Sequence, residues 1–142
     1  AASLMTAAMA VALAITAFLA WRAARAGASY RVIMPIAVLT ATLDLIVFNK
    51  VGSPQFVTWL AVPVILGVLF AAQNWRLPLF SVIVIALLTN LVYPVFYQDL
   101  LQLNPAALAL VSFRNILYIA LLVWANIQLS ALAKPSTQKV AD

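Results

Sequence analysis

A short polar segment between two apolar stretches carries the residue types that bind phosphates and sugars. It reads Phe-Asn-Lys-Val-Gly-Ser-Pro-Gln-Phe-Val-Thr-Trp over residues 48–59. The Lys50 ammonium can neutralise a phosphate, and the amides of Asn49 and Gln55 can donate hydrogen bonds to it. The Trp59 indole can contact a sugar or prenyl chain, or anchor a helix at the membrane interface. We therefore expect an anion site here. A lipid headgroup would satisfy it, although the neighbouring amides favour a specific phosphate.

Two charged residues lie inside apolar stretches. Asp44 comes about one turn before the end of its stretch, and Arg114 comes two to three turns after the start of the last one. Inserting a charged side chain at the membrane centre costs about 2.5–3.5 kcal/mol on insertion scales. A charge found within an apolar stretch therefore indicates a role in ligand binding or in structure. Both readings stay open: Arg114 contacts the phosphate, or Asp44 and Arg114 form a structural ion pair between helices.

A polar and aromatic set precedes the last apolar stretch. Asn90, Tyr93 and Tyr97 recur at i, i+3 and i+7, which places them on one face if the helix continues that far. Tyr93 and Tyr97 are candidates for sugar or prenyl contacts. The alternative is that this face serves helix packing and the aromatic belt.

The composition excludes several kinds of chemistry. The chain has 142 residues, no Cys and no His, and its three acidic residues are Asp44, Asp99 and Asp142. Thiolate catalysis, a His-based triad and a metal centre therefore lack their residues, and we expect no cofactor or metal. We also expect no catalytic residue within this chain.

The elements that must position these residues are apolar helices. Of the 142 residues, 67% are hydrophobic and 8% are charged, against about a quarter charged in soluble domains. Continuous Ala- and Leu-rich runs predict an all-α, polytopic membrane helix bundle, with about 20 residues per span. The five predicted spans are residues 1–20, 32–48, 55–72, 77–95 and 105–133, with a turn at 98–104. We assign 1–133 to one bundle domain and 134–142 to a cytoplasmic tail.

The net charge of +5 indicates how the protein is oriented in the membrane rather than that it binds nucleic acid. With five spans, six cations fall on one side of the membrane: Arg22, Arg25, Arg31, Arg76, Lys134 and Lys139. Lys50 falls on the other side of the membrane. Arg114 lies within its span, close to that same side. The positive-inside rule then predicts a multi-pass plasma-membrane protein with a cytoplasmic C-terminus and an outward-facing polar layer.

The polar segment resembles a pattern in membrane mannosyltransferases of the GT-C type. The pattern, roughly N-K-V-x-S-P-Q-Y/F-x-x-W-x-x-P, is similar to that of glycosyltransferase family 87 and is matched over residues 49–59, and Pro63, four residues after Trp59, matches a proline that often follows the tryptophan. The stretch Val92-Tyr93-Pro94-Val95-Phe96-Tyr97, with Pro105 and Arg114-Asn115, also resembles the C-terminal end of that family. The resemblance covers about residues 45–128.

The resemblance implies a function and partners. Family 87 enzymes transfer mannose from polyprenyl-phosphate mannose to a lipid-linked glycan, such as a phosphatidylinositol mannoside, at the extracytoplasmic face. The proposed catalytic Asp of the family lies in an earlier loop that nothing here matches, and Asp44 is not assigned to its role.

We therefore expect the C-terminal membrane portion of such a GT-C-like enzyme, which takes part in lipoglycan biosynthesis. It would bind membrane lipids, donor and acceptor together with the remaining N-terminal part. A first residue of Ala fits a piece of a longer protein. The alternative is a non-catalytic five-helix scaffold or accessory subunit. A small transporter is less favoured, because no repeat relates the two halves.

Overall fold

A computed structural model describes residues 2–49, 53–71 and 74–134 of the chain. Within these residues the protein is entirely helical, without strands, and the prediction of an all-α fold is confirmed. The six helices are α1 (Ala2–Arg25), α2 (Tyr30–Val47), α3 (Phe56–Ala71), α4 (Arg76–Val92), α5 (Tyr97–Leu101) and α6 (Pro105–Leu132).

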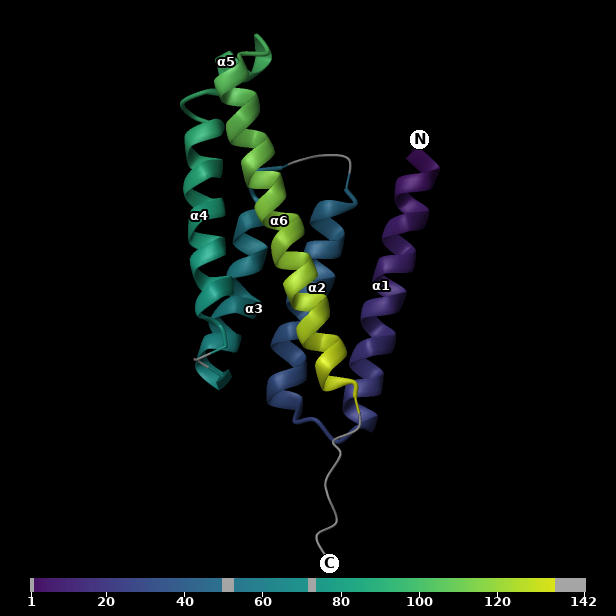
Figure 1. Cartoon of the computed structure of the whole chain (residues 1–142). Helices are drawn as coiled ribbons and strands as arrows, with labels where there is room; N and C mark the ends of the chain where they lie inside the picture. The colour runs from purple at the N-terminus through teal and green to yellow at the C-terminus, as the bar shows by residue number, and fades with distance from the viewer. Residues whose placement is uncertain (1, 50–52, 72–73, 135–142) are drawn as a thin grey trace, which may run out of the picture.

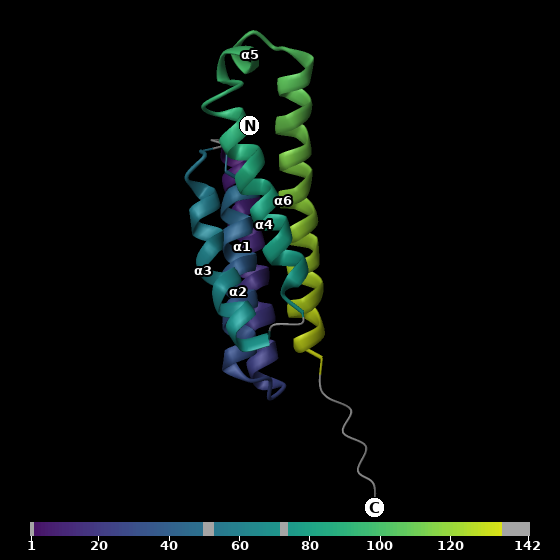
Figure 2. The same ribbon diagram turned by 90° about the vertical axis from the view of Figure 1, so that its left-hand side faces the viewer.

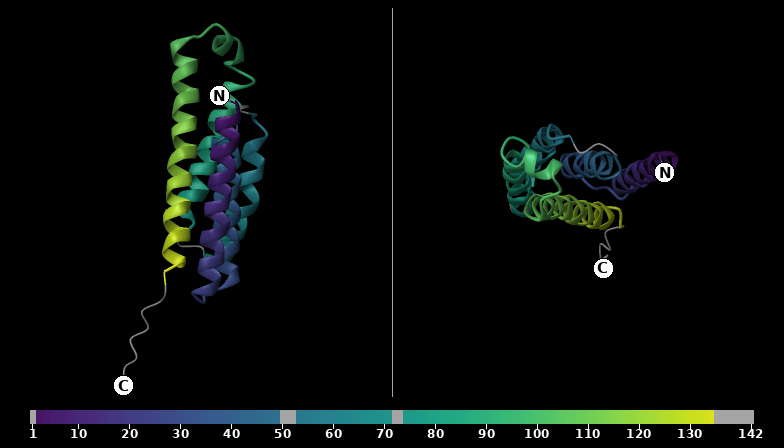
Figure 3. Two further views of the ribbon diagram at one scale, coloured as in Figure 1. Left: turned by 90° about the vertical axis from the view of Figure 1, so that its right-hand side faces the viewer. Right: turned by 90° about the horizontal axis from the view of Figure 1, so that it is seen from above.

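The long helices run up and down in an antiparallel bundle (Figure 1). Seen from above, α2, α3, α4 and α6 surround a common core, and α1 lies at the edge beside α2 (Figure 3). The core residues shared by these four helices include Leu39, Leu60, Ile85 and Leu121. Helix α1 adds a smaller contact near its C-terminal end, where Ala23 packs against Ile33 and Ala133.

Three helices are long and apolar enough to cross a membrane. They comprise Ser3–Arg25, Tyr30–Val47 and Pro105–Leu132, while Phe56–Phe70 and Arg76–Val92 are shorter apolar helices. Large apolar side chains such as Leu69, Phe80 and Ile127 also point outward. A water-soluble protein rarely exposes so much contiguous apolar surface. These features indicate a protein embedded in a membrane.

Three predicted boundaries differ from the structure. Helix α1 continues to Arg25, beyond the predicted end at residue 20, because its interfacial residues keep the helical backbone until Gly27, which has a φ of 84°. Helix α4 ends at Val92 rather than at residue 95, because Pro94 has no N–H with which to continue the helix. The short helix α5 occupies part of the predicted turn at 98–104.

The start of helix α6 has a well-defined cap. Pro105 occupies its first turn, and the Asn104 side chain accepts a hydrogen bond of 3.0 Å from the Ala106 N–H. A backbone N–H in the first turn of a helix has no partner within the helix, so a proline, which lacks this N–H, loses nothing there. Asn104 and Pro105 together therefore suit the start of a helix. The predicted start of the last span at residue 105 agrees with this helix.

One tight contact fixes α4 against α3. Trp75 is 2% exposed, its ring meets that of Trp124 edge-on at 5.9 Å, and it lies directly over Gly67. A Cβ built on Gly67 would overlap the Trp75 ring. Gly67 is therefore required for close approach of the indole rather than for an unusual backbone angle.

We predict that Gly67→Ala destabilises the bundle. Overpacking of this kind costs about 1–3 kcal/mol, which opposes a gain of about 1 kcal/mol in helix propensity. Unfolding by SDS titration in mixed micelles measures the net change. Trp75→Leu provides the control: in that background Gly67→Ala should cost nothing, and an equal cost in both backgrounds would contradict the role assigned to the indole.

Candidate anion-binding site

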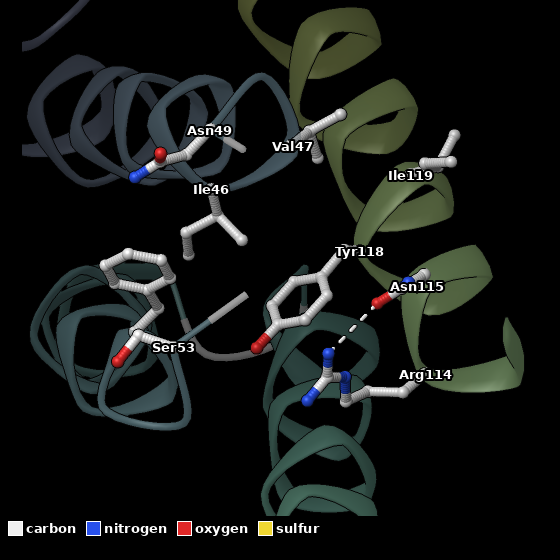
Figure 4. A pocket seen from close by; sticks show the side chains of 9 residues that line it. Ile46, Val47, Asn49, Ser53, Arg114, Asn115, Tyr118 and Ile119 are labelled. Carbon is white, nitrogen blue, oxygen red and sulfur yellow. Dashed lines mark hydrogen bonds between the residues drawn. The ribbon is translucent and has the colours of Figure 1, made fainter. Parts of the chain in front are cut away.

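A polar pocket lies where the end of α2 and the segment leading into α3 face the side of α6. Its volume is about 320 Å³. Figure 4 shows Asn49 and Ser53 across the opening from Arg114 and Asn115, with Tyr118 between them. The lining residues are Ile46, Val47, Asn49, Ser53, Phe56, Arg114, Asn115, Tyr118 and Ile119.

The guanidinium of Arg114 is the charged group of this pocket. The residue is 5% exposed, and one terminal nitrogen, Nη2, donates a hydrogen bond of 3.2 Å to Asn115 Oδ1. Its Nε is buried without a hydrogen-bond partner. An N–H that is buried without a partner typically costs 1–3 kcal/mol or more, so the site has unused hydrogen-bonding capacity.

Two aromatic rings hold the guanidinium in place. The central carbon of Arg114 lies 5.6 Å from the centre of the Tyr93 ring and 5.9 Å from that of the Tyr118 ring. Tyr118 also lies close to the Thr89 side chain of α4. Cation–π contacts at partly desolvated sites contribute about 1–2 kcal/mol each. The rings orient the guanidinium but leave its positive charge unneutralised.

The structure gives Asp44 and Arg114 separate partners. Asp44 is 2% exposed, and its carboxylate accepts a hydrogen bond of 2.7 Å from Thr16 of α1. Between the two charged residues the structure shows no ion pair, and none of the nine lining residues of the pocket is acidic. The guanidinium therefore faces the pocket without a carboxylate beside it.

The position of Arg114 along α6 fits a membrane surface better than a membrane centre. From Lys134, at the end of α6 that lies beside the α1–α2 turn, Arg114 is 20 residues away, or about 30 Å at 1.5 Å per residue. That distance matches the thickness of a hydrocarbon core, about 30 Å. The first turns of α6, together with α5, extend beyond the ends of α2 and α3 (Figures 1 and 2).

The predicted site residues divide into groups. Asn49 lines the pocket, and Lys50 lies outside the described residues. Gln55 is exposed and away from the lining, and its carbonyl accepts a hydrogen bond of 2.6 Å from Thr58. Trp59 is 48% exposed and packs against Phe56 with 4.9 Å between ring centres. Gln55 and Trp59 thus do not reach the pocket.

The two tyrosines are arranged differently from the predicted helix face. Helix α4 ends before Tyr93, and Tyr97 begins α5, so no single helix carries Asn90, Tyr93 and Tyr97. The Tyr93 and Tyr97 rings nevertheless stack, with centres 6.2 Å apart. Asn90 is exposed and donates to the Ala86 carbonyl at 3.0 Å. Tyr93 joins the Arg114 cluster, and Tyr97 contacts it only through the Tyr93 ring.

Three of the polar lining residues were not among the predicted site residues. Ser53 belongs to the polar segment, and Asn115 and Tyr118 follow Arg114 at i+1 and i+4. The i, i+4 spacing of Arg114 and Tyr118 was the available signal, because such residues lie on one helix face. Within the described part of the chain, no group of three or more His, Cys, Asp or Glu residues could hold a metal ion.

No protein-family model, curated protein or solved structure matches the chain. The resemblance to glycosyltransferase family 87 therefore remains an expectation from the residues quoted for it.

Double-mutant cycles should separate the two buried charges. We predict that Thr16→Val and Asp44→Leu are coupled by about 0.6–1.7 kcal/mol, the range measured for hydrogen bonds between membrane helices. Asp44→Leu and Arg114→Met should be additive within about 0.5 kcal/mol, because they share no partner. Unfolding free energies of single and double variants provide both values. Strong coupling in the second cycle would restore the ion-pair interpretation.

Proposed function

We propose that the pocket beside Arg114 binds the phosphate group of a lipid carrier. The observation that supports this most directly is a buried guanidinium with an unpaired Nε and no carboxylate in the pocket lining. A phosphate oxygen would supply the missing acceptor and the missing negative charge together. Asn49, Ser53 and Asn115 offer neutral polar groups on both sides of the same opening.

A lipid-borne phosphate fits the location better than a soluble one. The pocket combines these polar residues with the apolar side chains of Ile46, Val47 and Ile119. A phosphate attached to a prenyl chain would place its charge near Arg114 and its chain along the apolar outer surface of the helices. The estimated 30 Å from Lys134 puts that phosphate at the outer headgroup level if the basic end of the bundle is cytoplasmic.

In specific terms, we propose the C-terminal membrane portion of a mannosyltransferase that uses polyprenyl-phosphate mannose. In this proposal five helices cross the plasma membrane, and the site opens to the extracytoplasmic side. When mannose leaves the carrier, negative charge grows on the departing phosphate, and a fixed guanidinium stabilises it. The base that activates the acceptor hydroxyl would come from another part of the enzyme, which agrees with a lining without acids.

The proposal predicts that Arg114→Met weakens binding of polyprenyl phosphate by purified protein in micelles. Hydrogen bonds to charged groups contribute about 1.5–3 kcal/mol, so the Kd should rise about 10- to 150-fold. Arg114→Lys keeps the charge but loses the planar fork and should bind with intermediate affinity. Arg76→Met is the matched control. It removes an exposed arginine at the start of α4, which is the end of that helix away from the Arg114 pocket.

Two outcomes decide between the functions. An unchanged Kd for Arg114→Met, with wild-type helicity, would contradict the proposal and favour the non-catalytic scaffold. If Arg76→Met weakened polyprenyl phosphate binding equally, the binding would reflect general attraction of the phosphate to positive charges rather than a specific site. For Lys50, which lies outside the described residues, Lys50→Ala in an enzyme that contains this segment should weaken use of the lipid-linked donor.

A further inference from the structure

A second cationic surface lies at the opposite end of the bundle from the Arg114 pocket. Here the last turns of α1 and the end of α6 form an open groove of about 410 Å³. Its lining residues are Phe18, Trp21, Arg22, Arg25, Ala26 and Ala133. We name this surface the α1–α6 groove, and no part of it belongs to the Arg114 pocket.

The two arginines of the α1–α6 groove are held by aromatic neighbours. The Arg22 guanidinium lies 5.9 Å from the centre of the Phe18 ring, and that of Arg25 lies 5.3 Å from the Trp21 ring. Each ring–arginine pair has i, i+4 spacing, and the two arginines are three residues apart, so both guanidiniums lie on the same side of α1. Both rings are about half exposed, at 52% and 55%.

The helix end itself does not use these charges. The N–H of Ala26 bonds to the Arg22 carbonyl at 2.9 Å, and that of Ala28 bonds to the Ala23 carbonyl at 3.1 Å. This backbone arrangement around Gly27 satisfies the final carbonyls of α1. The guanidiniums are therefore not needed to cap the helix.

No carboxylate in the described residues is placed to neutralise the groove. Asp44 is buried against Thr16, and Asp99 lies in α5 at the far end of the bundle. Asp142, the third acid, lies outside the described residues. The groove thus presents two adjacent positive charges, with exposed Lys134 next to Ala133 in the sequence.

Two small residues, Ala26 and Ala133, line the α1–α6 groove. Ala133 is 5% exposed and packs with the fully buried Ala23 of α1 and with Ile33 of α2. Small residues allow α1 and α6 to approach closely, which leaves room above them between the larger aromatic and arginine side chains. Ala26 and Ala133 thus give a bound molecule a surface of small side chains to lie against.

The order of residues along α1 matches the structure of a phospholipid. Phe18 and Trp21 come first, toward the apolar body of the helix, and Arg22 and Arg25 follow toward its end. Acyl chains would contact the aromatic side, and an anionic headgroup would contact the guanidiniums. Basic pockets between membrane helices at the cytoplasmic face are suited to this kind of ligand.

We propose that the α1–α6 groove binds an anionic phospholipid of the membrane leaflet at this end of the bundle. The lipid would bridge α1 and α6, and this would strengthen the attachment of a helix that lies at the edge of the core. The site acts independently of the Arg114 pocket.

The test uses dioleoyl phosphatidylglycerol titrated into the purified full chain in detergent micelles. A ligand that binds the folded state raises its stability as RT ln(1 + [L]/Kd), so the rise in unfolding temperature with lipid concentration gives an apparent Kd. We expect saturable stabilisation by phosphatidylglycerol. An equal rise with dioleoyl phosphatidylcholine would contradict recognition of the negative charge.

Variants locate the site. Arg22→Gln with Arg25→Gln should raise the Kd at least tenfold, and Arg22→Lys with Arg25→Lys, which keeps both charges but loses the planar forks, should raise it less. Arg31→Gln with Arg76→Gln is the matched control, because it removes the same charge from the same end outside the groove. It should change the Kd less than twofold.

An unchanged Kd in the glutamine double variant would overturn the proposal, as would an equal loss in the control. Helical circular dichroism verifies that each variant is folded. If the double variant is not folded, the single variants Arg22→Gln and Arg25→Gln replace it, each with an expected increase of about threefold or more.

Discussion

A desolvated positive charge is the constraint around which one end of this bundle is arranged. The Arg114 guanidinium is almost fully buried and has no acidic partner in its pocket. Burial of an uncompensated charge costs several kcal/mol, so neighbouring groups must offset that cost. Tyr93 from the end of α4, Tyr118 from α6 and the Asn115 amide do so in part. The remaining deficit is the physical basis of the proposal that the pocket binds an anion.

The unequal lengths of the helices determine where that charge lies. Helix α6 has 28 residues, whereas α2 and α3 have 18 and 16. Because α6 extends beyond its neighbours, Arg114 lies level with the end of α2, where polar groups from the following segment can face it.

The arginines at the two ends of the bundle differ in burial and in their contacts. At one end a single arginine is buried between aromatic rings, with its hydrogen bonds incomplete. At the other, Arg22 and Arg25 are exposed and lie over rings of their own helix. A buried charge selects a ligand strongly because both lose water on binding, whereas exposed charges interact more weakly and are screened by salt.

The sequence by itself determined the helical class and the approximate helix positions, and it marked Arg114 as a charge within an apolar run. Long apolar runs permit few structures in a lipid environment, and a charge within such a run is costly wherever it points. Tertiary structure decided which side chains meet. It turned Gln55 and Trp59 away from the pocket, brought Ser53 and Tyr118 into it, and paired Asp44 with Thr16. Spacing along one helix cannot fix these contacts, because they depend on the rotation and offset of helices against each other.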